Sequence, residues 1–362
     1  MLNNISVIFE DSRYGGPHSQ FCNLAKILKT KINFKILISN LESDFFEKKL
    51  NNINIKYQKK KIFFLSSNKK NIINYFIFFL KDIILIIHIL NKNNSEYVYL
   101  PGGSSCFKSV IASLLLKKKI IWHIHDAHSN FCLRFIFLVL SIFVWKIIFA
   151  SKKSFDFYPN YFGQKKIKIL QSAVFKKHIK RKILKKKMNV ALVANFNPIK
   201  NIELFLKIVN MYKNNKNFFF YLIGQVWNTK EDYYLKCKKI IKNNDIKNLK
   251  IYNKFPNKFY NKIHLLLCTS LSESSPLSLW EAVSANIPII TTDIGDIKIL
   301  NKKIKFAYVI NKKNPTLFYD KINYLFNNTN KYLYLSNQCK YAYRNFFDIK
   351  NYGKYFLNFF KN

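Results

Sequence analysis

The chain has 362 residues, enough for two domains of about 150–200 residues each, and 49% of them are hydrophobic, so two sizeable cores can be buried. Its six cysteines form no Cys-x-x-Cys pair and no cluster with metal-ligand spacing, so we expect buried free thiols in a reducing compartment. A formal charge of +42 suits an anionic partner, either nucleic acid or a membrane surface, although AT-rich coding would also enrich Lys, Asn, Ile, Phe and Tyr.

The first half of the chain alternates strand and helix patterns. Residues 5–9 form an apolar strand pattern, and a turn at Gly15 and Gly16 leads into a helix with apolar residues on one face. Because Glu10 and Asp11 end this short apolar run, we expect no signal peptide. The alternation predicts a parallel sheet with helices on both faces, whose ligands bind at the carboxyl ends of the strands. Further strands are expected at residues 34–39, 97–100, 119–124 and 146–150.

Two apolar segments could be mistaken for membrane spans. Residues 72–90 contain Lys81 and Asp82, and residues 131–150 contain Arg134. A charge within a span costs a few kcal/mol on insertion scales, at roughly 2.5–3.5 kcal/mol near the centre. We therefore expect buried or interfacial elements of an α/β domain in both places.

The second half repeats the plan after a strongly basic segment at residues 176–187. A nuclear signal or nucleic-acid patch would have this composition, but a strand pattern starts immediately afterwards, which favours a solvated interdomain linker. The remaining strands are expected at residues 188–194, 218–223, 249–252, 265–269 and 287–292, and C-terminal helices at about 314–327, 331–346 and 348–360.

Glu273 and Glu281 are the most informative pair of residues. Pro276 suits the first position of a helix and Ser275 suits the N-cap, so the helix should run to about Asn286. Glu273 then lies in the entering loop and Glu281 on the second turn, roughly 7–8 Å along the axis at about 1.5 Å per residue. The free N–H groups and positive dipole end between them form an anion site, which could hold a nucleotide diphosphate.

The whole block from residue 272 to 293 resembles the Glu-x7-Glu segment of family 4 of the retaining glycosyltransferases, also called glycosyl transferases group 1. That family reads approximately Glu-Gly-x-Pro-x-x-x-x-Glu-Ala, followed by a small-residue turn, a Pro and an apolar strand. The chain departs from it at Ser274, where Gly is usual. The resemblance covers about residues 5–350 and is strongest over 188–299.

The resemblance implies the GT-B fold, an α/β architecture of two Rossmann-like, doubly wound domains that face each other across a cleft. The N-terminal domain would bind the acceptor and the C-terminal domain the nucleotide-sugar. The expected boundaries are 1–175 for the acceptor domain, 176–187 for the basic linker, 188–345 for the nucleotide-sugar domain and 346–362 for a C-terminal helix that crosses back to the first domain.

Residues 193–201 follow a strand, open a helix and resemble the family segment Gly-Arg-Leu-x-x-x-Lys-Gly. The resemblance places Lys200 on the phosphates of the donor, although an ordinary surface lysine is the alternative. Asn195 stands where the family usually has Arg. This departure removes one cation from the expected diphosphate clamp and leaves a neutral donor.

In the first half, Gly15 and Gly16 would let the backbone approach the sugar and diphosphate, or would simply form a tight turn. His123, His125, Asp126 and His128 crowd one strand end. A metal site is not expected there, because no further Cys or His cluster completes a ligand shell. The resemblance makes His125 the best match to a histidine near the reacting sugar, with a turn-closing histidine as the alternative.

The resemblance thus implies transfer of a sugar from a nucleotide-diphosphate-sugar to an acceptor hydroxyl, with retention and without a metal or other cofactor. It assigns Glu273 to the donor-sugar hydroxyls, Glu281 to the ribose, and the amide donors of the helix that opens at Pro276 and Leu277 to the phosphates. No Asp-x-Asp motif is present, which argues against metal-dependent sugar transferases.

The acceptor is expected to be a lipid-linked or envelope glycan in polysaccharide or lipopolysaccharide synthesis, at the cytoplasmic face of a membrane. The basic, aromatic residues 57–80 suggest peripheral contact with anionic lipid. Three alternatives stay open: a GT-B epimerase, an inactive partner subunit, and a nucleic-acid-binding protein. The last is suggested by charge alone, so no nucleic-acid partner is expected.

Overall fold

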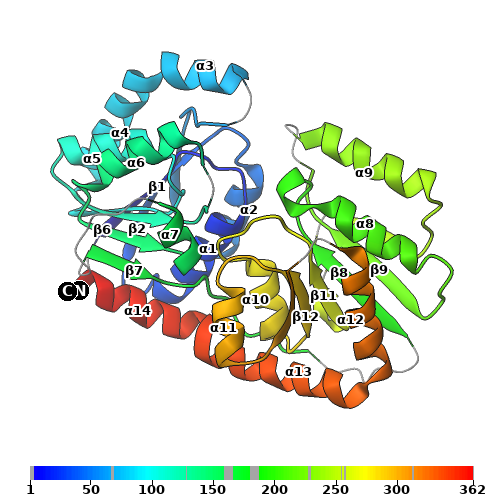
Figure 1. Cartoon of the computed structure of the whole chain (residues 1–362). Coiled ribbons are helices and arrows are strands. Elements are labelled where there is room, and N and C mark those ends of the chain that lie inside the picture. Colours follow the sequence, from blue (N-terminus) through cyan, green and yellow to red (C-terminus); the bar gives the residue numbers. More distant parts are fainter. Residues whose placement is uncertain are drawn as a thin grey trace. The chain divides into compact units, whose positions relative to one another are not determined.

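The computed structural model describes residues 4–66, 69–127, 129–158, 166–179, 187–226, 230–253, 255–256, 258–311 and 314–361. The chain divides into two compact units, Met1–Ala173 with Ile349–Asn362, and Val174–Asp348 (Figure 1). Each unit is an α/β domain built around one parallel sheet.

The sheet of the first unit has seven strands in the order β3-β2-β1-β4-β5-β6-β7. All of its pairings are parallel, and β1 lies between β2 and β4, with Val7 opposite Ile36 on one side and Tyr99 on the other. Central strands such as β1 and β5 are apolar and buried almost throughout, as expected of strands covered on both faces. The strands are β1 Asn4–Phe9, β2 Asn33–Ser39, β3 Tyr57–Lys60, β4 Tyr97–Leu100, β5 Lys119–Ile124, β6 Lys146–Phe149 and β7 Ile167–Ile169.

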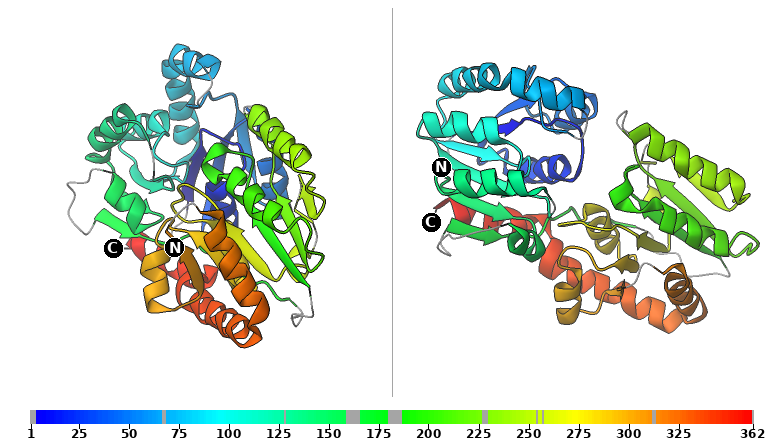
Figure 2. Two further views of the ribbon diagram at one scale, coloured as in Figure 1. Left: turned by 45° about the vertical axis from the view of Figure 1, so that its right-hand side comes forward. Right: turned by 45° about the horizontal axis from the view of Figure 1, so that its top comes forward.

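Helices cover both faces of this sheet (Figure 2). On one face α1 (Gly16–Leu28) packs against α2 (Asp44–Asn52) and against the C-terminal helix α14 (Ile349–Lys361). Gly353 makes the close approach of α14 to α1, because a Cβ there would lie 2.4 Å from the Ile27 side chain. On the other face α4 packs on α5, and α5 on α6. The remaining helices of this unit are α3 Lys69–Ile77, α4 Phe79–Asn93, α5 Phe107–Leu115, α6 Phe131–Ser141 and α7 Lys152–Phe157.

The sheet of the second unit has six parallel strands in the order β10-β9-β8-β11-β12-β13. One core cluster packs α8, α9 and α12 against this sheet, and another gathers α10, α11 and α13. The strands are β8 Met188–Val193, β9 Phe218–Ile223, β10 Leu249–Tyr252, β11 Leu265–Cys268, β12 Ile289–Thr292 and β13 Ala307–Ile310. The helices are η2 Pro198–Lys200, α8 Ile202–Met211, α9 Glu231–Asn243, η4 Phe259–Asn261, α10 Leu277–Ser284, α11 Ile297–Lys303, α12 Pro315–Asn327, α13 Thr329–Ala342 and η5 Tyr343–Phe347.

The doubly wound α/β architecture expected from the sequence is confirmed, and β4, β5, β9 and β10 have the expected bounds. Three strands were missed: β3, β7 and β13. Each is a sheet edge, where one side lacks a neighbouring strand and the apolar run is short. Residues 180–186 of the expected linker and His128 lie outside the described residues.

The two apolar segments form helices and one strand. Residues 72–90 fall on α3 and α4, and residues 131–150 on α6 and β6. Among the described residues no single helix is long and apolar enough to cross a membrane, whereas α3 and α4, bent by 62° at their junction, pass that test as a pair by length and composition only.

Candidate functional site

The carboxyl edge of the second sheet gathers most of the residues that the sequence singled out. The loop after β8 carries Asn195 and Lys200, and the loop after β11 carries Glu273 and leads into α10. Since β8 and β11 are neighbours in the sheet, their loops lie side by side at this edge.

Lys200 and Glu273 form an ion pair between these two loops. Their side chains are 25% and 17% exposed, so both stay within reach of a ligand. Ser270 Oγ donates to the same Glu273 oxygen at 2.9 Å. The loops are also joined through their backbones, because Leu271 N–H donates to the carbonyl of Ile199 at 2.7 Å. The pair therefore sits on a fixed scaffold.

A tight turn behind the Glu273 loop holds it in place. Gly295 N–H donates to the carbonyl of Glu273 at 2.9 Å, and Gly295 has a φ of 49°, which favours glycine. A Cβ on Gly295 would lie 2.2 Å from the carbonyl oxygen of Ser274. The turn is structural, and glycine is required for the loop to approach it.

The start of α10 differs from the sequence prediction by one residue. Pro276 is the N-cap, with extended ψ of 100°, and the helix begins at Leu277 and ends at Ser284. The carbonyl of Pro276 accepts from Leu279 and Trp280 at 3.1 and 3.3 Å. Ser275 lies one residue before this N-cap, and its hydroxyl accepts from Trp280 Nε1 at 2.9 Å.

The first N–H groups of α10 still have no acceptor inside the helix, as at any helix start. Leu277 and Ser278 contribute these groups and are partly exposed. Together with the dipole they make a site for negative charge, on the same chain segment as Glu273.

Glu281 lies on the second turn of α10, where the sequence placed it. Tyr260, which is buried, donates to its Oε2 at 2.7 Å, and Lys177 lies 3.7 Å from its Oε1. Burial raises the pKa of Tyr260 well above its usual value. This hydroxyl therefore stays protonated and donates a hydrogen bond to Glu281. Sequence reasoning missed Tyr260, and nothing in the local pattern of residues 258–262 marks it.

Asn195 closes the loop after β8. Its Oδ1 accepts from Gln225 N–H at 3.1 Å, and Phe196 N–H donates to the Gln225 carbonyl at 3.0 Å. The segments after β8 and β9 approach closely here, because a Cβ on Gly224 would lie 1.8 Å from the Ala194 carbonyl oxygen. The oxygen of the Asn195 amide is thus used structurally, and its NH2 group is the part that can serve a ligand.

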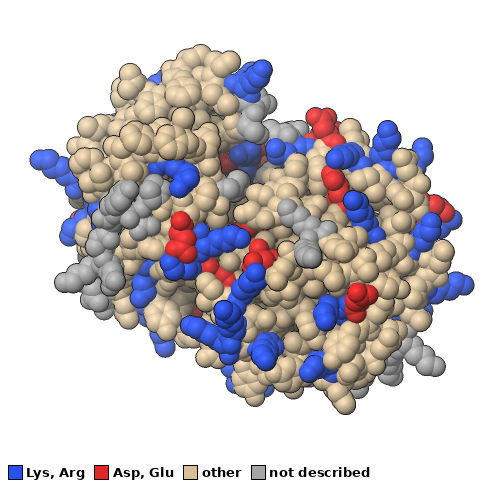
Figure 3. All heavy atoms as spheres, viewed as in Figure 1, with Lys and Arg blue, Asp and Glu red and all other residues tan. Residues whose placement is uncertain are grey.

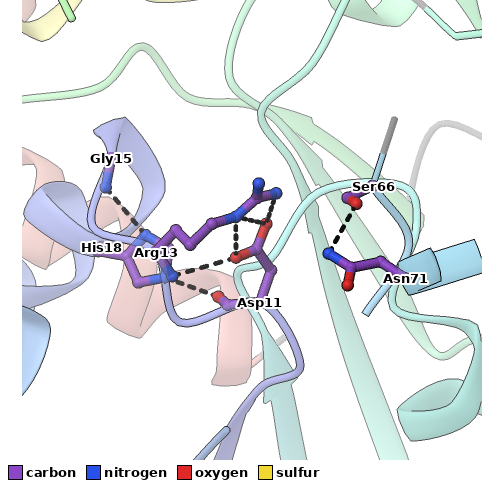
Figure 4. A network of polar contacts seen from close by, with 6 residues as sticks. All are labelled: Asp11, Arg13, Gly15, His18, Ser66 and Asn71. Carbon is purple, nitrogen blue, oxygen red and sulfur yellow. Dashed lines mark hydrogen bonds and ion pairs between the residues drawn. The ribbon is translucent and has the colours of Figure 1, made fainter. Parts of the chain in front are cut away.

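In the first unit, the turn between β1 and α1 is fixed by a polar network (Figure 4). Arg13 makes two parallel hydrogen bonds to the Asp11 carboxylate, 2.9 Å from Nε to Oδ1 and 2.7 Å from Nη2 to Oδ2. His18 Nδ1 accepts from Gly15 N–H at 3.2 Å, and Nε2 donates to the Asp11 carbonyl at 2.8 Å. Gly15 is the N-cap of α1, and a Cβ on Gly16 would meet nothing within 4 Å.

His125 follows β5 directly, and its ring lies 3.8 Å from that of His123, so the two side chains point the same way as expected. His123 is fully buried and bonded to Tyr99 OH at 2.7 Å. Burial lowers the pKa of His125 to about 3. At neutral pH its imidazole is therefore uncharged, and its Nε2 has no hydrogen-bond partner within the described part of the chain. Such a group can donate or accept a single hydrogen bond.

Asp126 takes a structural role. Its Oδ2 accepts from Ser104 Oγ at 2.6 Å and from Tyr158 OH at 2.8 Å. Across the residues that the structure describes, no group of three or more His, Cys, Asp or Glu side chains has the arrangement of a metal site.

Glu10, at the carboxyl end of β1 in the first sheet, is a further residue that sequence reasoning did not assign to a site. It follows β1, is 3% exposed, and accepts from Ser109 N–H at 2.7 Å. Burial raises its pKa to about 7, and its second oxygen has no partner among the described residues. The signal in the sequence was an acidic residue directly after a buried strand.

Residues 174–342 match the family described as Glycosyl transferases group 1. The sequence matches no curated protein sequence.

Several solved structures share the fold over the whole chain. Anabaena HepE in complex with UDP and glucose is 13% identical with a TM-score of 0.84, and the match covers 99% of both chains. Sucrose-phosphate synthase from Thermosynechococcus elongatus is 9% identical with a TM-score of 0.80, covering 99% of this chain and 98% of that one. TarM from S. aureus is 15% identical with a TM-score of 0.78, covering 99% and 100%. The chain has the GT-B fold, and its residues 174–342 form a domain of the glycosyl transferases group 1.

Proposed function

We propose that this protein transfers a sugar from a UDP-sugar to an acceptor hydroxyl. The observation that carries the proposal is the carboxyl edge of the second sheet, where Lys200, Glu273 and the start of α10 meet, with Glu281 one turn further along. A cation and free amides suit a diphosphate, and two carboxylates suit sugar and ribose hydroxyls. UDP is favoured as the carrier because the similar HepE structures hold UDP, UDP with glucose, or UDP-glucose.

In this reaction the residues of the second unit bind and stabilise the donor. Lys200 and the amides of Leu277 and Ser278 offset the charge that the diphosphate gains as it leaves. Glu281, held by Tyr260, accepts hydrogen bonds from the ribose, and Glu273 accepts from the donor sugar. His125 of the first unit is available as a neutral hydrogen-bonding group, since its pKa of about 3 removes it from acid–base work at neutral pH.

The proposal is tested by calorimetric binding of UDP, GDP and ADP, followed by mass analysis of products from UDP-sugars and simple alcohol acceptors. UDP should bind at least tenfold more tightly than the other two, and a glycoside should form with retained configuration. Equal binding of all three nucleotides would overturn the choice of UDP. Nucleotide-sugar turnover without glycoside would point to an epimerase instead.

An inactive partner subunit is a second candidate, because Asn195 supplies no cation where the family usually has Arg. Its amide oxygen is already bonded to Gln225, so the side chain cannot swing freely toward a phosphate. UDP binding with no turnover of any UDP-sugar would favour this candidate.

We also propose that the acceptor is a lipid-linked or cell-envelope glycan, as in lipopolysaccharide or polysaccharide synthesis, and that the protein works at the cytoplasmic face of a membrane. The basic, aromatic composition of residues 57–80 supports this, as do cysteines that are free wherever the structure describes them. Transfer of a labelled sugar to an organic-solvent extract of membranes tests the acceptor. Label that appears only in water-soluble glycans would contradict it.

A further inference from the structure

One face of the first unit exposes apolar side chains on consecutive helices. On α3, Phe76 and Ile77 are each 67% exposed, and on α4, Leu80 is 72% and Ile84 67% exposed. The opposite side of α4 packs in the core cluster with the sheet, and α3 packs on α4. Ordinary surface helices place polar residues on the outer side.

The same layer continues on α6. Phe131 is 78% exposed, Phe135 57% and Phe143, just after the helix, 65%. Since α4 packs on α5 and α5 on α6, the exposed residues belong to one side of the unit. Contiguous apolar surface of this kind marks a site of protein or membrane contact.

The charge of this face has one sign. Across α3, α4, α5 and α6 the only acidic residue is Asp82, and it is 2% exposed and paired with Lys108. Exposed lysines lie on the same helices, at Lys69 and Lys70 of α3 and Lys81 of α4. Figure 3 shows the surface over these helices, at the upper left, as nearly all uncharged with basic atoms at its margin and no acidic atoms.

We propose that this face, formed by the outer sides of α3, α4 and α6, docks on a bilayer surface that contains anionic lipid. Its Phe, Leu and Ile side chains would enter the boundary between headgroups and acyl chains, while the lysines would reach the headgroup phosphates. The proposal deepens the proposed function, on whose lipid-linked acceptor it rests, because such an acceptor is met at that boundary.

Charge complementarity decides between lipid and a second copy of the chain. A twofold contact through this face would bring Lys69, Lys70 and Lys81 of both copies together with no exposed carboxylate on these helices to offset them. An anionic bilayer offers both an apolar layer and negative charge, which attracts each lysine near it.

The test is co-sedimentation of the full chain with vesicles of phosphatidylcholine alone and of an equimolar mixture with phosphatidylglycerol. We expect binding to the mixture that weakens with salt. The variant Leu80→Gln/Phe135→Gln should lose at least about tenfold in vesicle affinity, given the apolar area withdrawn from lipid. The variant Lys69→Glu/Lys81→Glu should lose a similar factor on the mixture and little on the neutral vesicles.

Matched controls carry the same changes on α9 and α12 of the second unit. Leu235 and Leu317 are 56% and 37% exposed, so Leu235→Gln/Leu317→Gln should sediment like the unmodified chain. Lys239→Glu/Lys242→Glu controls for the change in net charge. Circular dichroism checks that each variant is folded.

Three results would overturn the proposal: equal recovery on both vesicle types, equal losses in the α9 and α12 controls, or a dimer that dissociates in Leu80→Gln/Phe135→Gln. The last would show that a second copy covers the face. UDP binding measured without lipid separates this outcome from failure of the proposed function, because the face variants should bind UDP normally.

Discussion

Lys200 and Glu273 lie 73 positions apart in the chain and meet as a half-buried ion pair at the carboxyl edge of the second sheet. Each carries a charge that the donor would engage: the lysine its diphosphate, the glutamate its sugar. In the absence of donor they offset each other, so binding must exchange this pair for contacts with the ligand.

The exchange predicts opposite effects on UDP affinity for the two partners. Lys200→Ala should weaken UDP binding about 10- to 150-fold, because a charge-assisted contact worth roughly 1.5–3 kcal/mol is lost and Glu273 is left to repel the diphosphate. Glu273→Gln should bind UDP as well as or better than the unmodified chain but lose turnover. Calorimetry with UDP and initial rates with UDP-sugar measure both, and unchanged UDP binding by Lys200→Ala would remove the phosphate assignment.

The Tyr260–Glu281 hydrogen bond predicts how the ribose is recognised. Glu281→Ala should bind UDP and its 2′,3′-dideoxy analogue with nearly equal affinity, whereas the unmodified chain should prefer UDP by about tenfold or more. Tyr260→Phe keeps the Glu281 carboxylate but removes the hydrogen bond that orients it. This variant should therefore lose part of the preference for UDP. A preference that survives in Glu281→Ala would show that other groups hold the ribose.

The positions of these residues at strand ends could be predicted from the sequence, because the residues lie in linear motifs that follow strands. Glu281 and Lys200 were placed on the correct elements, and the central strands were found because both of their faces are apolar. The pairing of Lys200 with Glu273 and of Tyr260 with Glu281 was not readable, since it depends on which strands become neighbours. The start of α10 was predicted one residue too early, since Pro276 is the N-cap and the helix begins at Leu277.

Removing one partner of the buried Lys108–Asp82 pair should destabilise the fold strongly, whereas replacing both by apolar residues should not. The Nζ–Oδ2 distance is 2.6 Å, the side chains are 0% and 3% exposed, and Asp82 also accepts from Phe63 N–H at 3.0 Å. Lys108→Met should lower the free energy of unfolding by about 3–5 kcal/mol, because it leaves the buried Asp82 carboxylate without its cationic partner. Lys108→Met/Asp82→Leu should recover much of that loss in urea titrations. Equal losses in the single and double variants would contradict this account.

Buried histidines should make the first unit sensitive to acid. Burial lowers the pKa of His18 to about 4 and that of His125 to about 3, from 6.5. Below pH 6.5 these histidines bind more protons in the unfolded chain than in the folded chain. Their contribution to stability is therefore complete above pH 6.5 and is lost as the pH falls toward 4. Glu10 has the opposite sign: its pKa rises from 4.5 to about 7, so its effect is full below 4.5 and is lost as the pH rises to 7.

Between pH 4.5 and 6.5 the pH dependence of stability that comes from Glu10 therefore offsets that of one histidine. Glu10→Gln should steepen the fall of the melting temperature on acidification in this range, and His125→Asn should make it shallower. Thermal unfolding at half-unit pH steps measures both slopes. Parallel profiles for all three proteins would show that these groups do not set the pH dependence.

The turn at Gly295 should control the site without contacting the donor. Gly295→Ala places a Cβ 2.2 Å from the Ser274 oxygen at a φ of 49°, so the loop that carries Glu273 must move away. We expect a loss of about 1–3 kcal/mol in stability and a fall in turnover larger than the fall in UDP affinity, because Lys200 and α10 keep their places. Gly102→Ala is the matched control, since its nearest neighbour is the Cys106 Cβ at 4.0 Å. If Gly295→Ala retained full turnover with only a lower melting temperature, the position of the Glu273 loop would not limit catalysis.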